Sequence, residues 1–161
     1  MLNLMTIDSP LGPLRLVADE AALAGVYLPA QAAPAASPGA TPVLARAAAQ
    51  LAEYFAGARR DFDVPLAPRG TEFQARVWRE LTHIPYGETR SYGELARALG
   101  RPSASRAVGA ANGKNPISIL VPCHRVIAGS GALTGYAGGL EAKRCLLAQE
   151  TRGAAGTRRA S

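Results

Sequence analysis

The sequence predicts an α+β protein in which a small antiparallel sheet with a helix is followed by a mostly helical part. Three observations predict this class: short alternating apolar segments near the N-terminus, repeated helix start and stop signals after residue 70, and a Pro- and Gly-containing segment at 65–70 between them. We therefore expect an N-terminal α/β subdomain at residues 1–68 and a mostly helical domain at residues 69–151. Residues 152–161, which contain mainly Arg, Ala and Gly, are expected to form a disordered basic tail.

Three N-terminal segments alternate apolar and polar residues in the way that half-buried strands do: residues 2–7, 14–18 and 23–28. The connections between them are short and contain turn-forming or acidic residues, so we expect an antiparallel meander. The Ala-, Pro- and Gly-rich residues 29–40 are expected to form a loop, and residues 61–66 a weaker extended segment.

A first helix is expected after Thr41, which can cap it, because Pro42 is favoured at a first helical position. Gly57 is expected to end this helix. Helical spacing places its apolar residues on one face: Leu44, Ala48, Leu51, Ala52 and Phe55.

Three further helices are expected after residue 70, each preceded by a hydroxyl residue that can cap it: Thr71, Ser91 and Ser103. The first of them ends in a turn at 84–87 and the second at Gly100. The third spans residues 104–112, and its short connection to the second predicts a helix-turn-helix. The apolar run 117–121 is expected to be strand-like, and a last helix to cover about residues 139–150.

The composition restricts the classes to which this chain can belong. Its 161 residues suit one domain or a compact pair, and no apolar stretch of about 18 residues could cross a membrane. The N-terminus lacks the basic start and cleavage site of a signal peptide, so we expect a cytoplasmic protein without membrane contact. The net charge of +6 modestly favours a nucleic-acid partner, since 16 of the 18 basic residues are Arg. A monomer is expected.

Two cysteines and two histidines could carry covalent or metal chemistry. Their spacing fits no zinc site, so neither a metal nor another cofactor is expected. Cys145 is interpreted as a small buried hydrophobe of the last helix, and His83 as a capping or surface residue. Cys123 differs because it follows the apolar run and Pro122, and because the adjacent His124 could raise its thiolate share. Cys123 is therefore a candidate nucleophile, with an acid on a neighbouring element expected to orient the imidazole.

The run around this cysteine, Pro122-Cys123-His124-Arg125-Val126-Ile127, closely resembles the active-site signature of O6-alkylguanine-DNA alkyltransferases, also called methylated-DNA–protein-cysteine methyltransferases. Other segments resemble the same family in order and spacing, so that the resemblance spans roughly residues 5–151: 9–12, 73–78, 84–87, 91–96, 105–109, 115–121 and 135–140. It implies DNA repair by direct reversal, in which Cys123 takes the alkyl group of O6-alkylguanine irreversibly and once per molecule. The second domain would then bind DNA and carry the active-site loop.

The resemblance also implies a role for each matching residue. His124 would act through a water as the base for Cys123, and Glu150 would hold His124. Tyr92 would protonate guanine N3, and Asn115 would brace the turn that carries the site. The substrate pocket would be formed around a further set of residues, with backbone groups reading the edge of the base: Tyr136, Val126 and Ala137.

By the same resemblance, the helix at 104–112 would enter the minor groove of double-stranded DNA and help to extrude the damaged base. Small residues on its face could approach the groove closely: Ala107, Gly109 and Ala110. Arg106 would fill the space that the extruded base leaves. Without the motif at Cys123, packing between two helices would be the preferred interpretation of this Ala-rich face. Contacts to DNA are expected to be mostly with phosphates and independent of sequence.

Two other functions fit parts of the pattern. A non-catalytic damage sensor of the same fold would lack the cysteine, whereas a Cys-His hydrolase or acyltransferase would need a small-molecule pocket. Ser118 stands where relatives often have Pro, which could change the tolerance of bulky adducts, and O4-alkylthymine is a second conceivable substrate. Arg125 is interpreted as structural.

Overall fold

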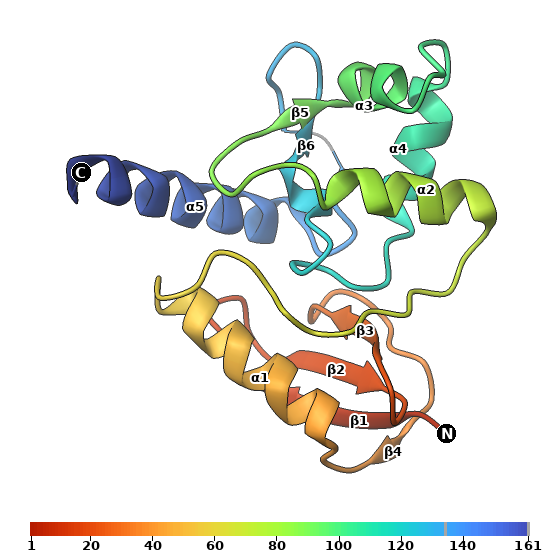
Figure 1. The fold of residues 1–161 in the computed structure, drawn as a ribbon, viewed down its shortest axis with the longest axis vertical. Coiled ribbons are helices and arrows are strands. Elements are labelled where there is room, and N and C mark those ends of the chain that lie inside the picture. The colour runs from red at the N-terminus through yellow and green to blue at the C-terminus, as the bar shows by residue number, and fades with distance from the viewer. Residues whose placement is uncertain (134, 161) are drawn as a thin grey trace. The chain divides into compact units, whose positions relative to one another are not determined.

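The computed structural model describes residues 1–133 and 135–160, and for 156–160 it describes the helical backbone alone. The chain divides into two compact units, Met1–Arg69 with Pro116–Ser118 and Gly70–Asn115 with Ile119–Ser161. The described part is α+β, with a four-stranded sheet in the first unit and most helices in the second, which confirms the predicted class (Figure 1).

The first unit contains the predicted meander of β1 (Asn3–Ile7), β2 (Leu14–Ala18) and β3 (Leu23–Tyr27), in the sheet order β3-β2-β1-β4. The short strand β4 (Ser37–Pro38) pairs in parallel with β1, inside the segment that we expected to be a loop. This pairing fills the open edge of β1 with backbone hydrogen bonds. The expected extended segment at 61–66 contributes an isolated bridge between Leu23 and Leu66.

Helix α1 (Pro42–Phe55) begins as predicted, because the Thr41 hydroxyl accepts a hydrogen bond from the Leu44 N–H at 3.2 Å. It packs on the sheet of the same unit (Figure 1). Its buried face differs from the predicted one, since Ala52 is exposed and Tyr54 is fully buried. The Tyr54 ring contacts the ring of Phe62, with centroids 5.5 Å apart. Burying this large aromatic ring stabilises the fold more than burying the methyl group of Ala52, and it sets the rotation of α1 about its own axis.

In the second unit, α2 (Glu72–Leu81) and α3 (Tyr92–Ala98) begin with capping boxes at Thr71 and Ser91, as their sequences predict. The predicted cap Ser103 is wrong, because α4 (Ser105–Gly113) begins after Ala104 and has no side-chain cap. A turn in which the Ala104 N–H donates to the Arg101 carbonyl moves the start of α4 by one residue. Helices α3 and α4 form the predicted helix-turn-helix, and Trp78 Nε1 donates to the Ala111 carbonyl at 2.8 Å, which fixes α4 to α2.

The strand expected at 117–121 is wrong. Ile117 makes an isolated bridge to Val26, but Ile119 has a φ of 76°, a left-handed conformation that a β-branched residue adopts at a cost. Beyond it the chain enters the 3₁₀ turn η1 (Cys123–Arg125) and then β6 (Val126–Ile127), which pairs in parallel with β5 (Arg90–Ser91). The buried side chain of Ile119, 1% exposed, holds this turn in the loop that leads to η1.

Helix α5 (Leu140–Ala160) continues past the expected end near residue 150, which corrects the predicted disordered tail at 152–161; Ser161 lies outside the described residues. Ala and Arg favour helices, and Gly153 lies against the Tyr86 ring, so the extension is supported by packing. Among the described residues, no helix combines the length and apolarity needed to cross a bilayer.

Replacing Gly87 with alanine is expected to lower the free energy of unfolding by about 1–3 kcal/mol. Gly87 has a φ of 84°, and an added Cβ would lie 2.7 Å from the Cβ of Ala154 on α5. Urea unfolding measures the loss. Gly57→Ala is the matched control, since Gly57 has a φ of 79° but no atom within 4 Å of an added Cβ. Equal losses in the two variants would contradict packing of α5 against the turn at Gly87.

Candidate active site

Cys123 is the first residue of η1 and is 5% exposed. Burial raises the pKa of its thiol, while hydrogen bonds from the side chains of Asn115 and Tyr136 and the positive charge of Lys143 act in the opposite direction. The resting thiol is therefore protonated at neutral pH, and the surroundings hold groups that stabilise the thiolate once a base has removed the proton.

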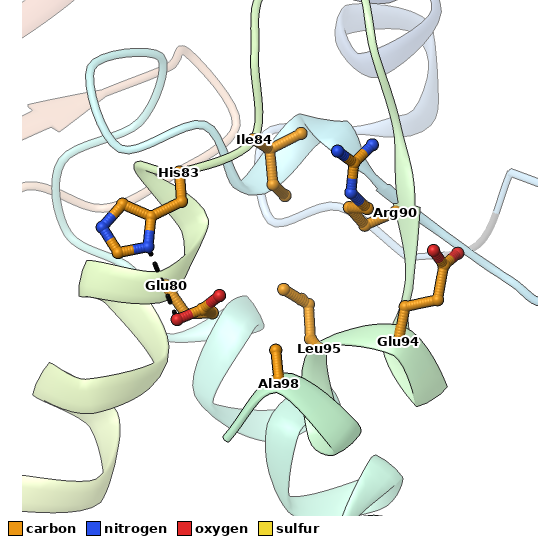
Figure 2. A pocket seen from close by; sticks show the side chains of 7 residues that line it. All are labelled: Glu80, His83, Ile84, Arg90, Glu94, Leu95 and Ala98. Atoms are coloured by element: carbon orange, nitrogen blue, oxygen red, sulfur yellow. Dashed lines mark ion pairs between the residues drawn. The ribbon is translucent and has the colours of Figure 1, made fainter. Parts of the chain in front are cut away.

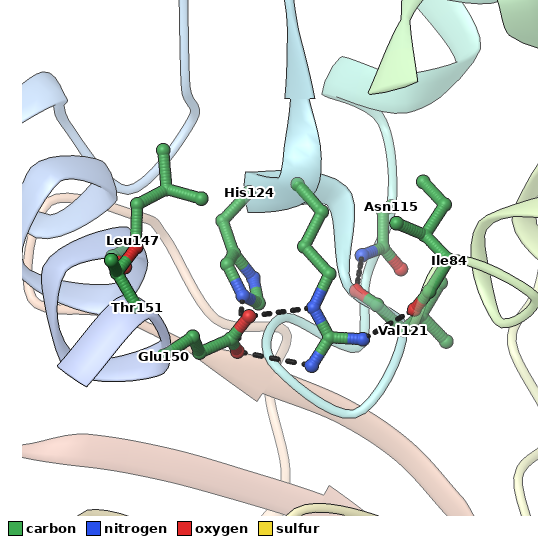
Figure 3. Close-up of polar contacts among 8 residues, drawn as sticks. Ile84, Asn115, Val121, His124, Leu147, Glu150 and Thr151 are labelled. Carbon is green, nitrogen blue, oxygen red and sulfur yellow. Dashed lines mark hydrogen bonds and ion pairs between the residues drawn. The ribbon is translucent and has the colours of Figure 1, made fainter. Parts of the chain in front are cut away.

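The adjacent His124 is fully buried and forms a pair with Glu150 on α5, with 2.8 Å between Nε2 and Oε2 (Figure 3). Burial lowers the pKa of His124 even though Glu150 acts to raise it, so the imidazole is neutral at pH 7. With Nε2 donating to the carboxylate, Nδ1 carries the lone pair. This Nδ1 is buried and has no hydrogen-bond partner within the part of the chain that the structure describes. The pair thus fixes a neutral imidazole in one orientation on the residue that follows the cysteine.

Arg125 also binds the carboxylate of Glu150, through two of its guanidinium nitrogens. Its Nε lies 2.7 Å from Oε1 and its Nη2 3.0 Å from Oε2, while Nη1 donates to the Ile84 carbonyl at 2.6 Å. Burial alone would raise the pKa of Glu150, but the hydrogen bonds from His124 and Arg125 outweigh it and lower the pKa to about 2. Glu150 is therefore ionised and fixed in orientation, in line with the structural role expected for Arg125.

Asn115 lies in the loop that leads to Cys123, and its Nδ2 donates to the Val121 carbonyl at 2.9 Å (Figure 3). The side chain of Tyr136 acts to lower the pKa of the Cys123 thiol and is half-buried, whereas Ala137 next to it is exposed. Tyr92 begins α3 and lies against Gly109 of α4, where an added Cβ would be 3.6 Å from the ring. The structure thus gathers Asn115 and Tyr136 at the cysteine, and it places Tyr92 at the junction of the helix-turn-helix.

Lys143 is a residue of this site that the sequence analysis missed. Its side chain is fully buried, and its Nζ donates to the Val126 carbonyl at 2.6 Å. Burial lowers the pKa of Lys143, and the negative charge of an ionised Cys123 acts to raise it. Helical spacing could have identified it, because Lys143, Leu146 and Glu150 lie on one buried face of α5.

The expectation that Cys145 is a buried hydrophobe is wrong, since Cys145 is exposed. It lies two residues after Lys143, and a rotation of about 200° around the helix turns it away from the buried face. Cys123 is therefore the cysteine that the fold surrounds with a base and hydrogen-bond donors.

Helix α4 has the exposed face that a groove-binding helix needs. Arg106, Ala107 and Ala110 are exposed and Gly109 is half-buried, whereas Val108 and Ala111 are buried against the rest of the unit. Small side chains on the outer face allow close approach to another molecule, and Arg106 adds a positive charge to it.

A shallow pocket opens between the end of α2 and α3, lined by Glu80, His83, Ile84, Arg90, Glu94, Leu95 and Ala98 (Figure 2). The side chain of His83 is 71% exposed and lies 3.5 Å from Glu80, which agrees with its expected surface position. Acidic and basic groups are mixed here, so the pocket selects no ligand of one charge. Within the described residues, no group of His, Cys, Asp or Glu side chains could hold a metal ion.

A buried cysteine beside a His-Glu pair, in one unit with a helix-turn-helix, is the arrangement expected of a protein that carries out covalent chemistry on DNA. Comparison with known proteins identifies a family with this chemistry. Residues 4–68 match the ribonuclease-like domain of 6-O-methylguanine DNA methyltransferase, and residues 72–152 match its DNA-binding domain.

A methylated-DNA–protein-cysteine methyltransferase of Mycobacterium tuberculosis is 53% identical over 156 residues, which cover 93% of each chain. One from Methanosarcina acetivorans is 51% identical over 147 residues, 89% of this chain and 94% of that protein. The crystal structure of Mycobacterium tuberculosis OGT in complex with DNA superposes with a TM-score of 0.89 at 51% identity and covers 94% of both chains.

The chain therefore belongs to the 6-O-methylguanine DNA methyltransferase family. Its activity is that of a methylated-DNA–protein-cysteine methyltransferase, which repairs DNA by direct reversal, and DNA is its partner.

Proposed function

We propose that this chain removes the alkyl group of O6-alkylguanine in duplex DNA by transferring it to Cys123, once per molecule. The observation that carries the proposal is the buried arrangement of Cys123, the unpaired His124 Nδ1 and the ionised Glu150. A cysteine kept protonated by burial needs such a base, and the base needs a partner that fixes its tautomer.

In the proposed step, the thiol proton of Cys123 passes through a water to His124 Nδ1, and Glu150 stabilises the imidazolium that forms. The thiolate attacks the alkyl carbon in line, so that a C–S bond forms while the bond between carbon and O6 breaks. The electron pair of the broken bond stays on guanine, and Tyr92 supplies a proton to N3. The product is an unmodified guanine and an S-alkylated cysteine.

The residues around this step would position the base and stabilise charge. Tyr136, Val126 and Ala137 would form the pocket, and Asn115 would keep the loop in place. Lys143, which holds the Val126 carbonyl, would bring a positive charge to the thiolate, because electrostatic attraction is strong in a buried site. Helix α4 would approach the minor groove with Ala107, Gly109 and Ala110.

An oligonucleotide with one O6-methylguanine tests this function. We expect one methyl group to move to each protein molecule, with no second turnover when substrate is in excess. Binding without transfer would indicate a damage sensor, and repeated turnover would contradict an irreversible acceptor. A matched oligonucleotide with O4-methylthymine measures the second conceivable substrate. The expected monomer and cytoplasmic location are further proposals, tested by size-exclusion chromatography and by microscopy of a tagged chain.

Replacing Arg106 with alanine is expected to slow methyl transfer from duplex DNA by about 10-fold, while transfer from a single strand changes much less. The reason is that an extruded base leaves a gap in the stack only in the duplex, where the exposed Arg106 would fill it. Single-turnover rates on the two substrates measure the difference. Arg144→Ala, which removes an exposed cation from α5, is the control. Equal slowing on both substrates would argue against the role of Arg106 as a wedge.

A further inference from the structure

Asn112 is a buried polar residue on the inner face of α4, 5% exposed. Its Nδ2 donates to the carbonyl oxygen of Cys123 at 3.4 Å. Its Oδ1 is buried and has no hydrogen-bond partner within the described residues. A buried acceptor without a partner is costly, so an apolar side chain of the same size would suit this position better if packing were its only task.

The contact that Asn112 makes is with the nucleophile's own peptide group. The same carbonyl also accepts a hydrogen bond from the N–H of Val126, so the backbone of Cys123 is held from β6 and from α4. The hydrogen bond from the Val126 N–H is local, because it closes the η1 turn. The hydrogen bond from Asn112 comes from another element, and it joins a side chain of α4 to the backbone of Cys123.

Helix α4 therefore has an exposed outer face and an inner face that contacts the active-site loop. Its outer face carries the exposed Arg106 and Ala110, and its inner face carries Asn112. The neighbouring Ala111 carbonyl accepts the hydrogen bond from Trp78 Nε1 at 2.8 Å, so the C-terminal turn of α4 is anchored to α2 on one side and to Cys123 on the other. A displacement of α4 would reach Cys123 through this amide.

We infer that Asn112 is a positioning residue that couples the docking of α4 on DNA to the placement of Cys123. This inference rests on the proposed function, because it takes α4 as the DNA-contacting helix and Cys123 as the acceptor. The amide donor holds the carbonyl of Cys123, and the buried Oδ1 has no hydrogen-bond partner within the described residues that would tie Asn112 elsewhere.

The test compares Asn112→Leu, which keeps the volume and removes the hydrogen bond, with the wild type on two substrates. The first substrate is saturating duplex DNA with O6-methylguanine, and the second is the free O6-methylguanine base, which needs no docking of α4. We expect the variant's transfer rate on duplex to fall by about 10-fold, while its rate on the free base and its duplex affinity change by less than about 2-fold.

Val108→Ala is the matched control, since it weakens packing of the same inner face and the valine side chain has no polar group that could hydrogen-bond Cys123. It should slow both substrates together or neither, and thermal unfolding reports its stability. Asn112→Ala serves if the leucine variant does not fold. Equal slowing of both substrates by the Asn112 variants, or no slowing on duplex, overturns the coupling. A wild type that transfers no methyl group would instead refute the proposed function.

Discussion

Replacing Cys123 with alanine is expected to lower methyl transfer by a factor of about 10³ or more and to leave affinity for DNA nearly unchanged. In the proposed function the thiol is the reacting group, whereas the exposed face of α4 lies on another element and keeps all its side chains in the variant. Single-turnover assays measure transfer, and a binding assay with undamaged duplex measures affinity.

Cys145→Ser is the control for this variant, because Cys145 is exposed and lies on the side of α5 away from the buried face. It should transfer at the wild-type rate. Transfer that survives in Cys123→Ala and disappears in Cys145→Ser would move the acceptor to α5 and refute the assignment.

Replacing Glu150 with alanine is expected to lower the free energy of unfolding by about 3–5 kcal/mol, because it leaves the buried Arg125 without its carboxylate. Methyl transfer should fall as well, since His124 loses the group that fixes its tautomer. Denaturant unfolding and single-turnover rates measure the two effects. Glu141→Gln on the same helix is the control, as its side chain is 92% exposed. A stability loss no larger than that of the control would contradict the buried ion pair.

The stability effect of Glu150 should also depend on pH. Its pKa of about 2 in the folded protein lies below the ordinary value of 4.5, so the contribution of the carboxylate is complete above pH 4.5. As the pH falls from 4.5 towards 2 this contribution is lost, and the difference in stability between the wild type and Glu150→Gln should narrow. A difference that stays constant over this range would contradict the lowered pKa.

Local signals in the sequence were sufficient to predict much of the fold. Thr71 and Ser91 cap the helices that follow them, because capping depends on residues within one turn of each other. Ser103 fails as a cap since the turn from Arg101 competes for the same start, and a hydroxyl alone does not decide between the two. The apolar run before Cys123 has the composition of a strand, yet tertiary packing holds Ile119 in a conformation that no sequence pattern indicates.

In the candidate site, too, contacts between neighbours in the chain could be predicted, whereas contacts that depend on tertiary packing could not. Cys123 and His124 are adjacent, so their association could be inferred from the sequence alone. The partner of His124, Glu150, lies 26 positions away, so only the resemblance to the family, and no local pattern, assigned it this role. The bonds from Arg125 to Glu150 and from Lys143 to Val126 depend on where α5 packs, which the sequence does not encode locally. Asn112 was expected as the last residue of a helix, and only the fold brings it to the carbonyl of Cys123.

The central claim is that Cys123 is the acceptor of a single alkyl group. Mass spectrometry of the protein after reaction with duplex DNA containing O6-methylguanine tests it most directly, because one spectrum reports both the stoichiometry and the modified residue. We predict a mass increase of one methyl group per molecule, located on the peptide that contains Cys123. An unmodified Cys123 in protein that has repaired its substrate, or a methyl group on Cys145, would contradict the claim.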